Sequence, residues 1–407
     1  MMNASDESTM KNVEQPSKAR IVMPTVKGLE KAARALPFIP SKAHEYTWEE
    51  LETIERRRRD ILPNAEKGFW NSLSHFDGTI LNFLAKDTLF WFTVALYISV
   101  RMQARYSEIP SFVADLGNGN VATLGGFITF FLVLYVNKSH ARYFDQYGLS
   151  MACKGRIFDV ASLSITHLPK PTATRLVRYM NAAHVSAYVG LSKTYNKAFF
   201  LKLNRDFGML TDRELERMNI IDLDKGGSCN RELIVWCLRE IQQCRAAGLL
   251  DHELARDFRD QILGLRSSIG KIYNAADLPI PFFYVHFICL LTALYLPLFA
   301  VSAAYRAGTG GNVYWTADLI GGLVVVLQAI FVIGLRILGQ KMSDPYGDDL
   351  VDLSVIFFVT FTWTMSNRIL EAEYVDVIAE EEEALKREQI PIGGAWEHQD
   401  DSVVVHV

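Results

Sequence analysis

Apolar residues along the chain gather in four long runs, separated by polar stretches of very unequal length. The runs cover about 83–102, 119–138, 280–304 and 317–339. Because a helix needs about 20 mostly apolar residues to cross the hydrocarbon core of a bilayer, each run predicts a membrane-spanning helix. A fifth run at 353–365 is too short to span and predicts a buried or re-entrant segment.

The long polar stretch between the second and third runs, 140–278, has the periodicity of amphipathic helices. From Arg231 to Tyr273 apolar residues recur at intervals of three and four, which places them on one face of a helix. Thr211 and Glu214 have the spacing of a capping box, in which both side chains satisfy free amides at a helix start. Since strand-like alternation is hard to find, we predict an all-α membrane protein with four transmembrane helices and a large helical cytosolic region.

The basic residues indicate how these helices are oriented. The cluster Glu55–Arg59 precedes the first run, Arg142 follows the second and Lys341 follows the fourth. The short loop between the third and fourth runs holds Arg306 as its one basic residue. Lys and Arg are enriched in cytoplasmic loops, so both termini and the stretch 140–278 are predicted to lie in the cytosol.

The composition narrows the class of partner. Half of the 407 residues are apolar and the formal net charge is −4, too small a charge to suggest nucleic acid as a ligand. The five cysteines are scattered and none forms a CxxC pair. We therefore predict reduced thiols, and neither a disulfide framework nor a zinc site.

Both ends of the chain are polar. Residues 1–65 contain no apolar stretch of the kind a secretory signal needs, and they predict a partly disordered cytosolic segment. Residues 371–407 include an acidic run and predict a cytosolic tail. No sorting signal distinguishes the plasma membrane from an organelle membrane, such as that of a chloroplast.

The two candidate enzyme motifs in the sequence are both incomplete. His252–Arg256 begins like a zinc-protease motif, but an arginine stands where the second histidine is required. The glycines at 308, 310 and 311 lie in a loop between spans, without the strand and helix that phosphate binding requires. The protein is therefore not expected to be an enzyme.

The segment Ser343–Asp352 carries the most informative chemistry. Its four carboxylates flank or follow a Pro-Tyr-Gly turn, at Asp344, Asp348, Asp349 and Asp352. Like charges this close repel and require a counter-charge, and calcium takes about six to eight oxygen ligands. By itself the segment fits a calcium site or a solvated acidic turn, and the spacing of an EF-hand is missing.

Further motifs lie at defined distances from this acidic segment. They are Phe76–Thr79, Tyr135–Val136 with Arg142–Tyr147, Arg178–Asn181, Leu265–Arg266 with Gly270, Tyr273, Ile280–Pro281 and Tyr284, and Trp363 with Asn367–Arg368. Their order and spacing resemble the bestrophin family over about residues 70–370, with an insertion before the last motif. The resemblance implies a channel domain over 66–370 that forms a homopentamer around a central pore. Such a channel conducts chloride or bicarbonate and is gated or stabilised by calcium.

The resemblance places the calcium clasp at 341–353. The family's two clasp carboxylates correspond to Asp349 and Asp352, and backbone carbonyls near Lys341 and Asp344 would complete the site, with one more around Leu62. Two further acids of the family's string are replaced here by apolar residues at 350 and 351, which predicts weaker calcium binding.

The resemblance also places the pore. Its apolar neck corresponds to Gly126, Phe130 and Leu134, which share one helix face because they are four residues apart. A ring of such faces can gate by dewetting, although the same residues read alone fit a face against lipid or a neighbouring helix.

The cytosolic aperture of the family corresponds to Glu253, where an apolar residue is usual. A ring of glutamates there would oppose anions, unless the register slips by one to Leu254. A weakly selective or cation-conducting channel and a non-conducting membrane scaffold therefore stay open as alternatives.

Overall fold

The computed structural model describes residues 46–65, 79–106, 121–192, 194–220, 229–278, 280–309 and 315–372, together with positions 68, 70 and 76. The helices are α2 (Trp48–Ala65), α4 (Ile80–Lys86), α5 (Thr88–Tyr106), α7 (Val121–His167), α8 (Lys170–Tyr188), α9 (Lys197–Phe207), α10 (Asp212–Ile220), α11 (Cys229–Ala246), α12 (His252–Asp277), α13 (Phe282–Thr309), α14 (Trp315–Ser343) and α15 (Val355–Leu370). Over these ranges the only extended pairing is an isolated bridge between Val189 and Ser192, so the all-α prediction is confirmed. Of the predicted terminal segments, 1–65 and 371–407, residues 1–45 and 373–407 lie outside the described residues, and residues 48–65 form helix α2.

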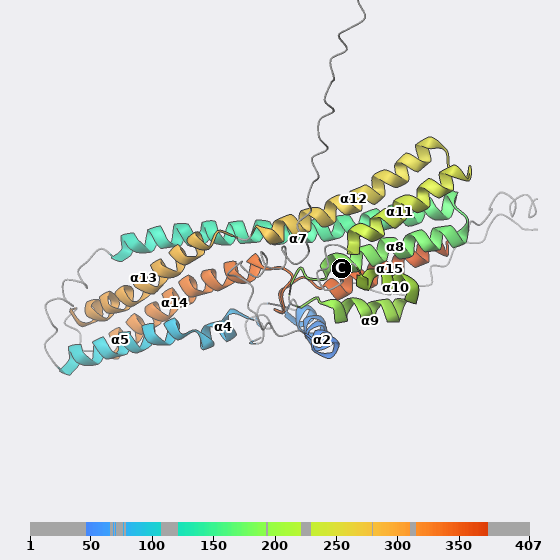
Figure 1. The fold of residues 1–407 in the computed structure, drawn as a ribbon. Coiled ribbons are helices and arrows are strands. Elements are labelled where there is room, and N and C mark those ends of the chain that lie inside the picture. The colour runs from blue at the N-terminus through green and yellow to red at the C-terminus, as the bar shows by residue number, and fades with distance from the viewer. Residues whose placement is uncertain are drawn as a thin grey trace, which may run out of the picture. The chain divides into compact units, whose positions relative to one another are not determined.

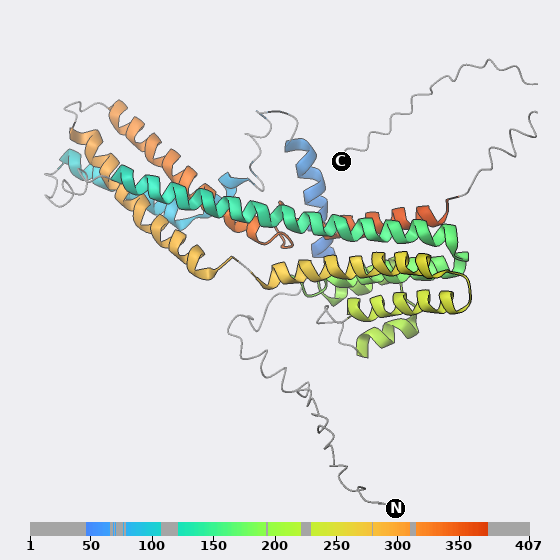
Figure 2. The same cartoon turned by 90° about the horizontal axis from the view of Figure 1, so that it is seen from above.

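Helix α7 connects two groups of helices (Figures 1 and 2). It is 47 residues long, about 70 Å at 1.5 Å per residue. Its first half packs on α13 and α14, and its second half packs on α8, α12 and α15. Buried positions recur along one side at intervals of three, four or seven residues, at Ile128, Leu132, Tyr135, Ser139, Gln146, Ser150, Cys153 and Ile157. Because α7 is one continuous helix, it fixes the position of each helix group relative to the residues of α7 that pack in the other group.

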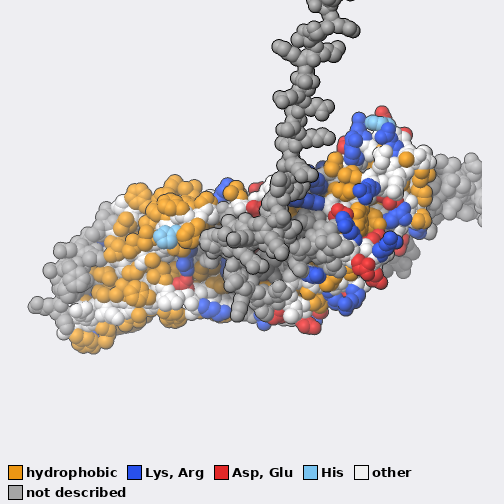
Figure 3. All heavy atoms as spheres, viewed as in Figure 1, with side chains coloured by type: hydrophobic (Ala, Val, Ile, Leu, Met, Phe, Trp, Pro, Cys, Tyr) orange, Lys and Arg blue, Asp and Glu red, His pale blue; other side chains and the backbone are white. Residues whose placement is uncertain are grey.

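The apolar group consists of α4, α5, α13, α14 and the first half of α7. Leu132, Leu296 and Val332 form the centre of its core and are fully buried. Its outer surface is apolar as well, as the orange area in Figure 3 shows. Phe92, Leu294 and Leu327 are each more than half exposed. A helical group that is apolar inside and outside is the arrangement expected within a bilayer.

Two helices of this group are long and apolar enough to cross a membrane by length and composition: Phe282–Ala307 and Trp315–Ser343. The pair α4 and α5 makes a third candidate if the two helices count as one broken span. The predicted second span, 119–138, starts outside the described residues and continues into the polar half of α7. Among the described residues there are thus two or three candidate spans, and the count of four stays a prediction.

The predicted first span, 83–102, is not one continuous helix. The chain bends by 67° between α4 and α5, because the carboxylate of Asp87 accepts the free N–H groups of Leu89 (2.9 Å) and Phe90 (3.2 Å) at the start of α5. The other carboxylate oxygen accepts a hydrogen bond from the Arg336 guanidinium of α14. The bend is therefore fixed by a side-chain cap and by an ion pair to a distant helix.

The polar group consists of α8 to α12, α15 and the second half of α7. Its core includes Ile157, Leu176, Tyr188, Phe199, Leu233, Phe258 and Ile262. The predicted capping box is confirmed: the Thr211 N–H donates to Glu214 Oε2 (2.8 Å) and the Glu214 N–H to Thr211 Oγ1 (3.4 Å). All five cysteines are free thiols, and four of them are buried.

The fifth apolar run forms α15, which packs on α7 and α8. Val355, Val359 and Thr362 are fully buried, whereas Phe357 on the opposite side is exposed. At 16 residues the helix is short for a span. The prediction of a buried segment is therefore confirmed for the face of α15 that packs on α7 and α8.

Helix α14 packs tightly on α7 at Gly339. A methyl group added there would meet the ring of Tyr135, 2.5 Å from its Cδ1 atom, and Tyr135 is almost completely buried. We expect Gly339→Ala to lower the free energy of unfolding by about 1–3 kcal/mol, because neither the ring nor the helix can move away freely. Thermal unfolding of the detergent-solubilised protein measures the change.

The matched control for this substitution is Gly148→Ala, on the same helix as Tyr135. A methyl group at Gly148 meets no atom within 4 Å, so alanine should stabilise the helix by about 0.5–1 kcal/mol. Equal changes in unfolding temperature for Gly339→Ala and Gly148→Ala would contradict the tight contact between α14 and α7.

Candidate pore face and acidic clasp

The three predicted neck residues lie together on the side of α7 that faces away from α13 and α14. The side chains of Phe130 and Leu134 are 59% and 44% exposed, and a methyl group added at Gly126 would meet no atom within 4 Å. Phe127, beside the glycine, is 60% exposed, so a bulky side chain is available one position further on. In the single chain this face therefore has no packing partner among the described residues.

The neck face is held in place by aromatic contacts from behind. The rings of Phe130 and Phe131 meet edge to face at 5.6 Å, and Phe131 meets Phe287 of α13 in the same way at 5.3 Å. The Tyr284 hydroxyl of α13 donates to the Phe131 carbonyl (3.0 Å). Phe130 therefore packs against a firmly held neighbour, and its ring stays exposed on the outer side of α7.

The predicted cytosolic aperture lies in the first turn of α12. The Asp251 side chain caps this helix by accepting the Leu254 N–H (2.7 Å). Glu253 is exposed, whereas Leu254 is half-buried against the core of the polar group. Glu253 is thus free to face a pore, and Leu254 already has a structural role.

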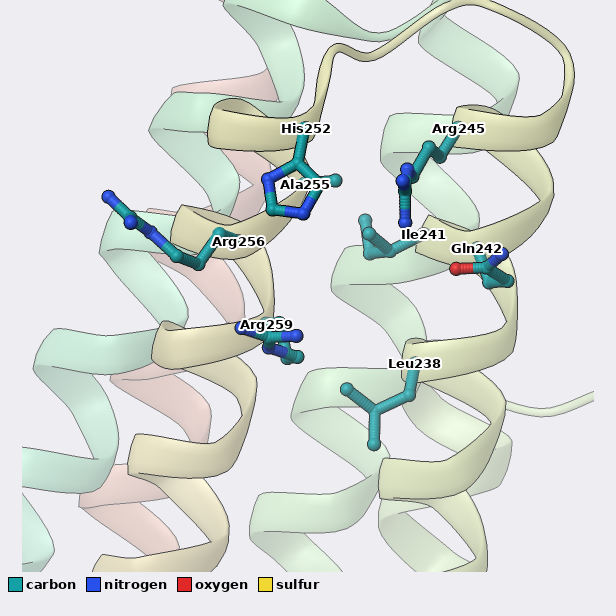
Figure 4. A pocket seen from close by; sticks show the side chains of 8 residues that line it. All are labelled: Leu238, Ile241, Gln242, Arg245, His252, Ala255, Arg256 and Arg259. Atoms are coloured by element: carbon teal, nitrogen blue, oxygen red, sulfur yellow. The ribbon is translucent and has the colours of Figure 1, made fainter.

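A basic cavity of about 240 Å³ lies beside Glu253, between α11 and α12. Figure 4 shows Arg245, His252 and Arg259 pointing toward the gap between the two helices, whereas Arg256 points away from it. Among the described residues Arg245 and Arg256 form no ion pair, and Arg259 has one at 3.8 Å, to Asp260. Uncompensated arginines create a local positive potential, which counteracts the charge of Glu253.

The acidic segment folds as a compact loop between α14 and α15. Its ends meet where the Leu353 N–H donates to the Pro345 carbonyl (2.8 Å). The Asp349 N–H donates to Asp352 Oδ2 (2.7 Å), and a methyl group at Gly347 would lie 2.7 Å from the same oxygen. The loop therefore wraps around the Asp352 carboxylate, and glycine is needed at 347.

The loop is anchored to α7 through Tyr346. Its buried hydroxyl is 2.9 Å from Ser150 Oγ and donates to the Gln146 carbonyl at 3.1 Å. Burial raises the pKa of the Tyr346 hydroxyl, so the group stays neutral and can donate. The position of the loop thus follows that of α7, the helix that carries the predicted neck.

The carboxylates of the loop already have positive or donating partners. Lys341 Nζ lies 2.6 and 2.8 Å from the two oxygens of Asp349. The Tyr46 hydroxyl donates to Asp348, and this hydrogen bond raises the pKa of Tyr46 to about 12. Asp352 is buried, which raises its pKa to about 8, and its Oδ1 has no hydrogen-bond partner.

Arg58 of α2 reaches the same loop from outside. Its Nε and Nη2 donate to the Asp349 carbonyl at 3.1 and 2.7 Å, and Nη2 also donates to the Gly347 carbonyl at 3.3 Å. Its Nη1 pairs with Glu55 at 2.6 Å. Only 3% of Arg58 is exposed, so its guanidinium is buried against the loop.

These contacts do not fit a calcium ion in the predicted clasp. Calcium takes about six to eight oxygen ligands, but Lys341 occupies both oxygens of Asp349 and Arg58 occupies two loop carbonyls. Nowhere in the described ranges do three Asp, Glu, His or Cys side chains gather closely enough to hold a metal. The side chain of Lys341 thus has a partner that the sequence did not predict, because its ammonium pairs with a clasp carboxylate. The predicted ligand role of the carbonyl near Lys341 stays a prediction.

Sequence reasoning missed Arg58 as a site residue. The cluster Glu55–Arg59 indicated membrane orientation, and nothing in its sequence distinguishes Arg58 from its neighbours. Burial distinguishes them, because Arg57 and Arg59 are exposed. The backbone carbonyl predicted around Leu62 lies in the last turns of α2, and its role as a ligand stays a prediction.

A long helix joined to a group of membrane-type helices defines a multi-pass membrane protein. The family model described as "Bestrophin, RFP-TM, chloride channel" matches residues 59–372. The chain belongs to the bestrophin family. It is therefore an integral membrane protein of an anion-channel family and not an enzyme.

Relatives and solved structures agree with this assignment. Bestrophin-6 of Caenorhabditis elegans is 20% identical over 307 residues, 74% of this chain and 79% of that protein. Bestrophin homolog 13 of the same organism is 21% identical over 258 residues, 61% of this chain and 62% of that protein. The fold is similar to that of a bacterial Bestrophin homolog from Klebsiella pneumoniae, with a TM-score of 0.59, 17% identity, and coverage of 70% of this chain and 98% of that one.

Proposed function

We propose that this chain is one subunit of a homopentameric channel with four spans, which passes chloride and bicarbonate through an apolar neck. The supporting observation is the face of α7 that carries Gly126, Phe130 and Leu134. It is apolar, rigidly supported from behind and without a packing partner among the described residues. Copies of this face around a common axis would give a narrow apolar passage that wets when the channel opens.

The selectivity for anions in this proposal rests on the basic cavity near Glu253. Arg245 and Arg259 point into that cavity, and a positive potential near an exit raises the local anion concentration. Glu253 alone would favour cations, which is the second candidate function. Calcium gating, which the resemblance predicts, stays outside this proposal because Lys341 and Arg58 engage the clasp oxygens.

Purified full-length protein in planar bilayers tests the proposal. We expect currents whose reversal potential follows the chloride gradient, and a smaller shift when bicarbonate replaces part of the chloride. A reversal potential that follows the cation gradient would establish the cation channel instead. No current from a preparation whose mass is five times the 46.0 kDa of one chain would support a non-conducting scaffold.

A further inference from the structure

The clasp contains two buried or half-buried cations that belong to the chain itself. The Lys341 ammonium contacts both oxygens of Asp349, and the two side chains are 29% and 25% exposed. The same ammonium lies 4.8 Å from the centre of the Phe83 ring, on the side of α4. It is thus held between a carboxylate and an aromatic face, in a place where water screens its charge only in part.

Arg58 provides the second cation. A divalent ion in a loop of this kind draws backbone carbonyls and carboxylates toward itself. Here the guanidinium of Arg58 draws the carbonyls of Gly347 and Asp349 together through its fan of N–H donors. The geometry of the loop is therefore closed by hydrogen bonds from a side chain.

Arg58 also connects the loop to its neighbours. Its partner Glu55 accepts a hydrogen bond from the Ser354 hydroxyl, and Ser354 caps α15 by accepting the Phe357 N–H (3.2 Å). On the other side, Arg142 of α7 donates to the Ser343 carbonyl (2.9 Å). Positive side chains from α2, α7 and α14 thus surround the acidic loop.

We propose that Lys341 and Arg58 replace a bound divalent cation in the clasp, so that the clasp closes without calcium. The ammonium of Lys341 stands at Asp349, one of the two carboxylates that the family resemblance assigns to the ion. The guanidinium of Arg58 adds a second positive charge at the same loop, through the carbonyls of Gly347 and Asp349. The ammonium of Lys341 blocks the approach of a cation to Asp349, whose neighbour Asp352 keeps one buried oxygen without a hydrogen-bond partner. Removing the charge of Lys341 therefore opens a site for calcium between these two carboxylates.

Calcium titration of the purified full-length chain tests the first half of the proposal. After treatment with a chelator, the wild type should show the same unfolding temperature with and without calcium, and equilibrium dialysis should find no saturable calcium binding that depends on Asp349. Saturable binding that raises the unfolding temperature and disappears in Asp349→Asn would overturn the proposal. Both readouts are independent of ion conduction.

Lys341→Met tests the second half. In chelator its unfolding temperature should fall by about 2–4 °C, the shift that about 1 kcal/mol produces in a large domain, and calcium should reverse the fall and bind saturably. Lys271→Met, at an exposed position of α12, is the control and should behave like the wild type. A Lys341→Met variant that neither loses stability nor binds calcium would refute the assignment.

A double variant protects this test against simple misfolding. If Lys341→Met does not fold, the combination with Asp349→Asn removes both charges of the pair and should recover part of the folded yield, since residues in contact are energetically coupled. A double variant that is as damaged as Lys341→Met alone would show that Lys341 does not act by neutralising Asp349, and would overturn the proposal.

Discussion

Replacement of both Phe130 and Leu134 by alanine should raise the current through the closed channel by about tenfold or more. The two side chains are the bulky members of the proposed neck and face away from the packed side of α7. A narrow apolar passage excludes water and ions, and smaller side chains lower the free energy of wetting it. A change of about 1.4 kcal/mol in that free energy corresponds to a factor of ten in the wetted population.

The control for the neck variant removes the same two side-chain types elsewhere. Phe92 of α5 and Leu327 of α14 are 54% and 56% exposed on the apolar group, and the double variant Phe92→Ala/Leu327→Ala should leave the closed-state current unchanged. Single-channel recording in bilayers compares the two variants with the wild type. A neck variant with wild-type closed current, or a control with equal leak, would count against the assignment of Phe130 and Leu134.

The fold could be predicted from the sequence wherever a local pattern decides it. The buried face of α12, with Phe258, Ile262 and Leu265, follows directly from apolar spacing, and the capping box at Thr211 needs only residues three apart. The break between α4 and α5 could not be predicted in this way. The cap that Asp87 makes at the start of α5 is local, but its pairing with Arg336, 249 positions away in sequence, is not visible in any local pattern.

The candidate site was predictable to the same extent. Asp349 and Asp352 are three residues apart, and the Asp349 N–H donates to the Asp352 carboxylate, so a local contact brings the two residues together. The source of the counter-charge was not predictable. It comes from the side chain of Lys341 and from α2, which lies far away in sequence, and spacing cannot distinguish a protein cation from a metal ion.

The largest loss of stability is expected from Arg58→Met. The substitution keeps most of the apolar length of the side chain but removes the guanidinium that pairs with Glu55 and holds two loop carbonyls. Glu55, whose side chain is 12% exposed, would keep its charge without a cationic partner. Breaking a buried pair lowers the free energy of unfolding by about 3–5 kcal/mol, and a loss toward the lower end of this range is expected here. Thermal or denaturant unfolding of the solubilised protein measures the loss.

Arg57→Met is the matched control, because Arg57 precedes Arg58 on the same helix and is exposed. Exposed substitutions of this kind change stability by about 0.5 kcal/mol or less. Adding Glu55→Gln to Arg58→Met should restore part of the lost stability, since the unpaired charge is then removed as well. Equal losses for Arg57→Met and Arg58→Met, or no recovery in the double variant, would mean that the buried guanidinium does not hold the acidic loop.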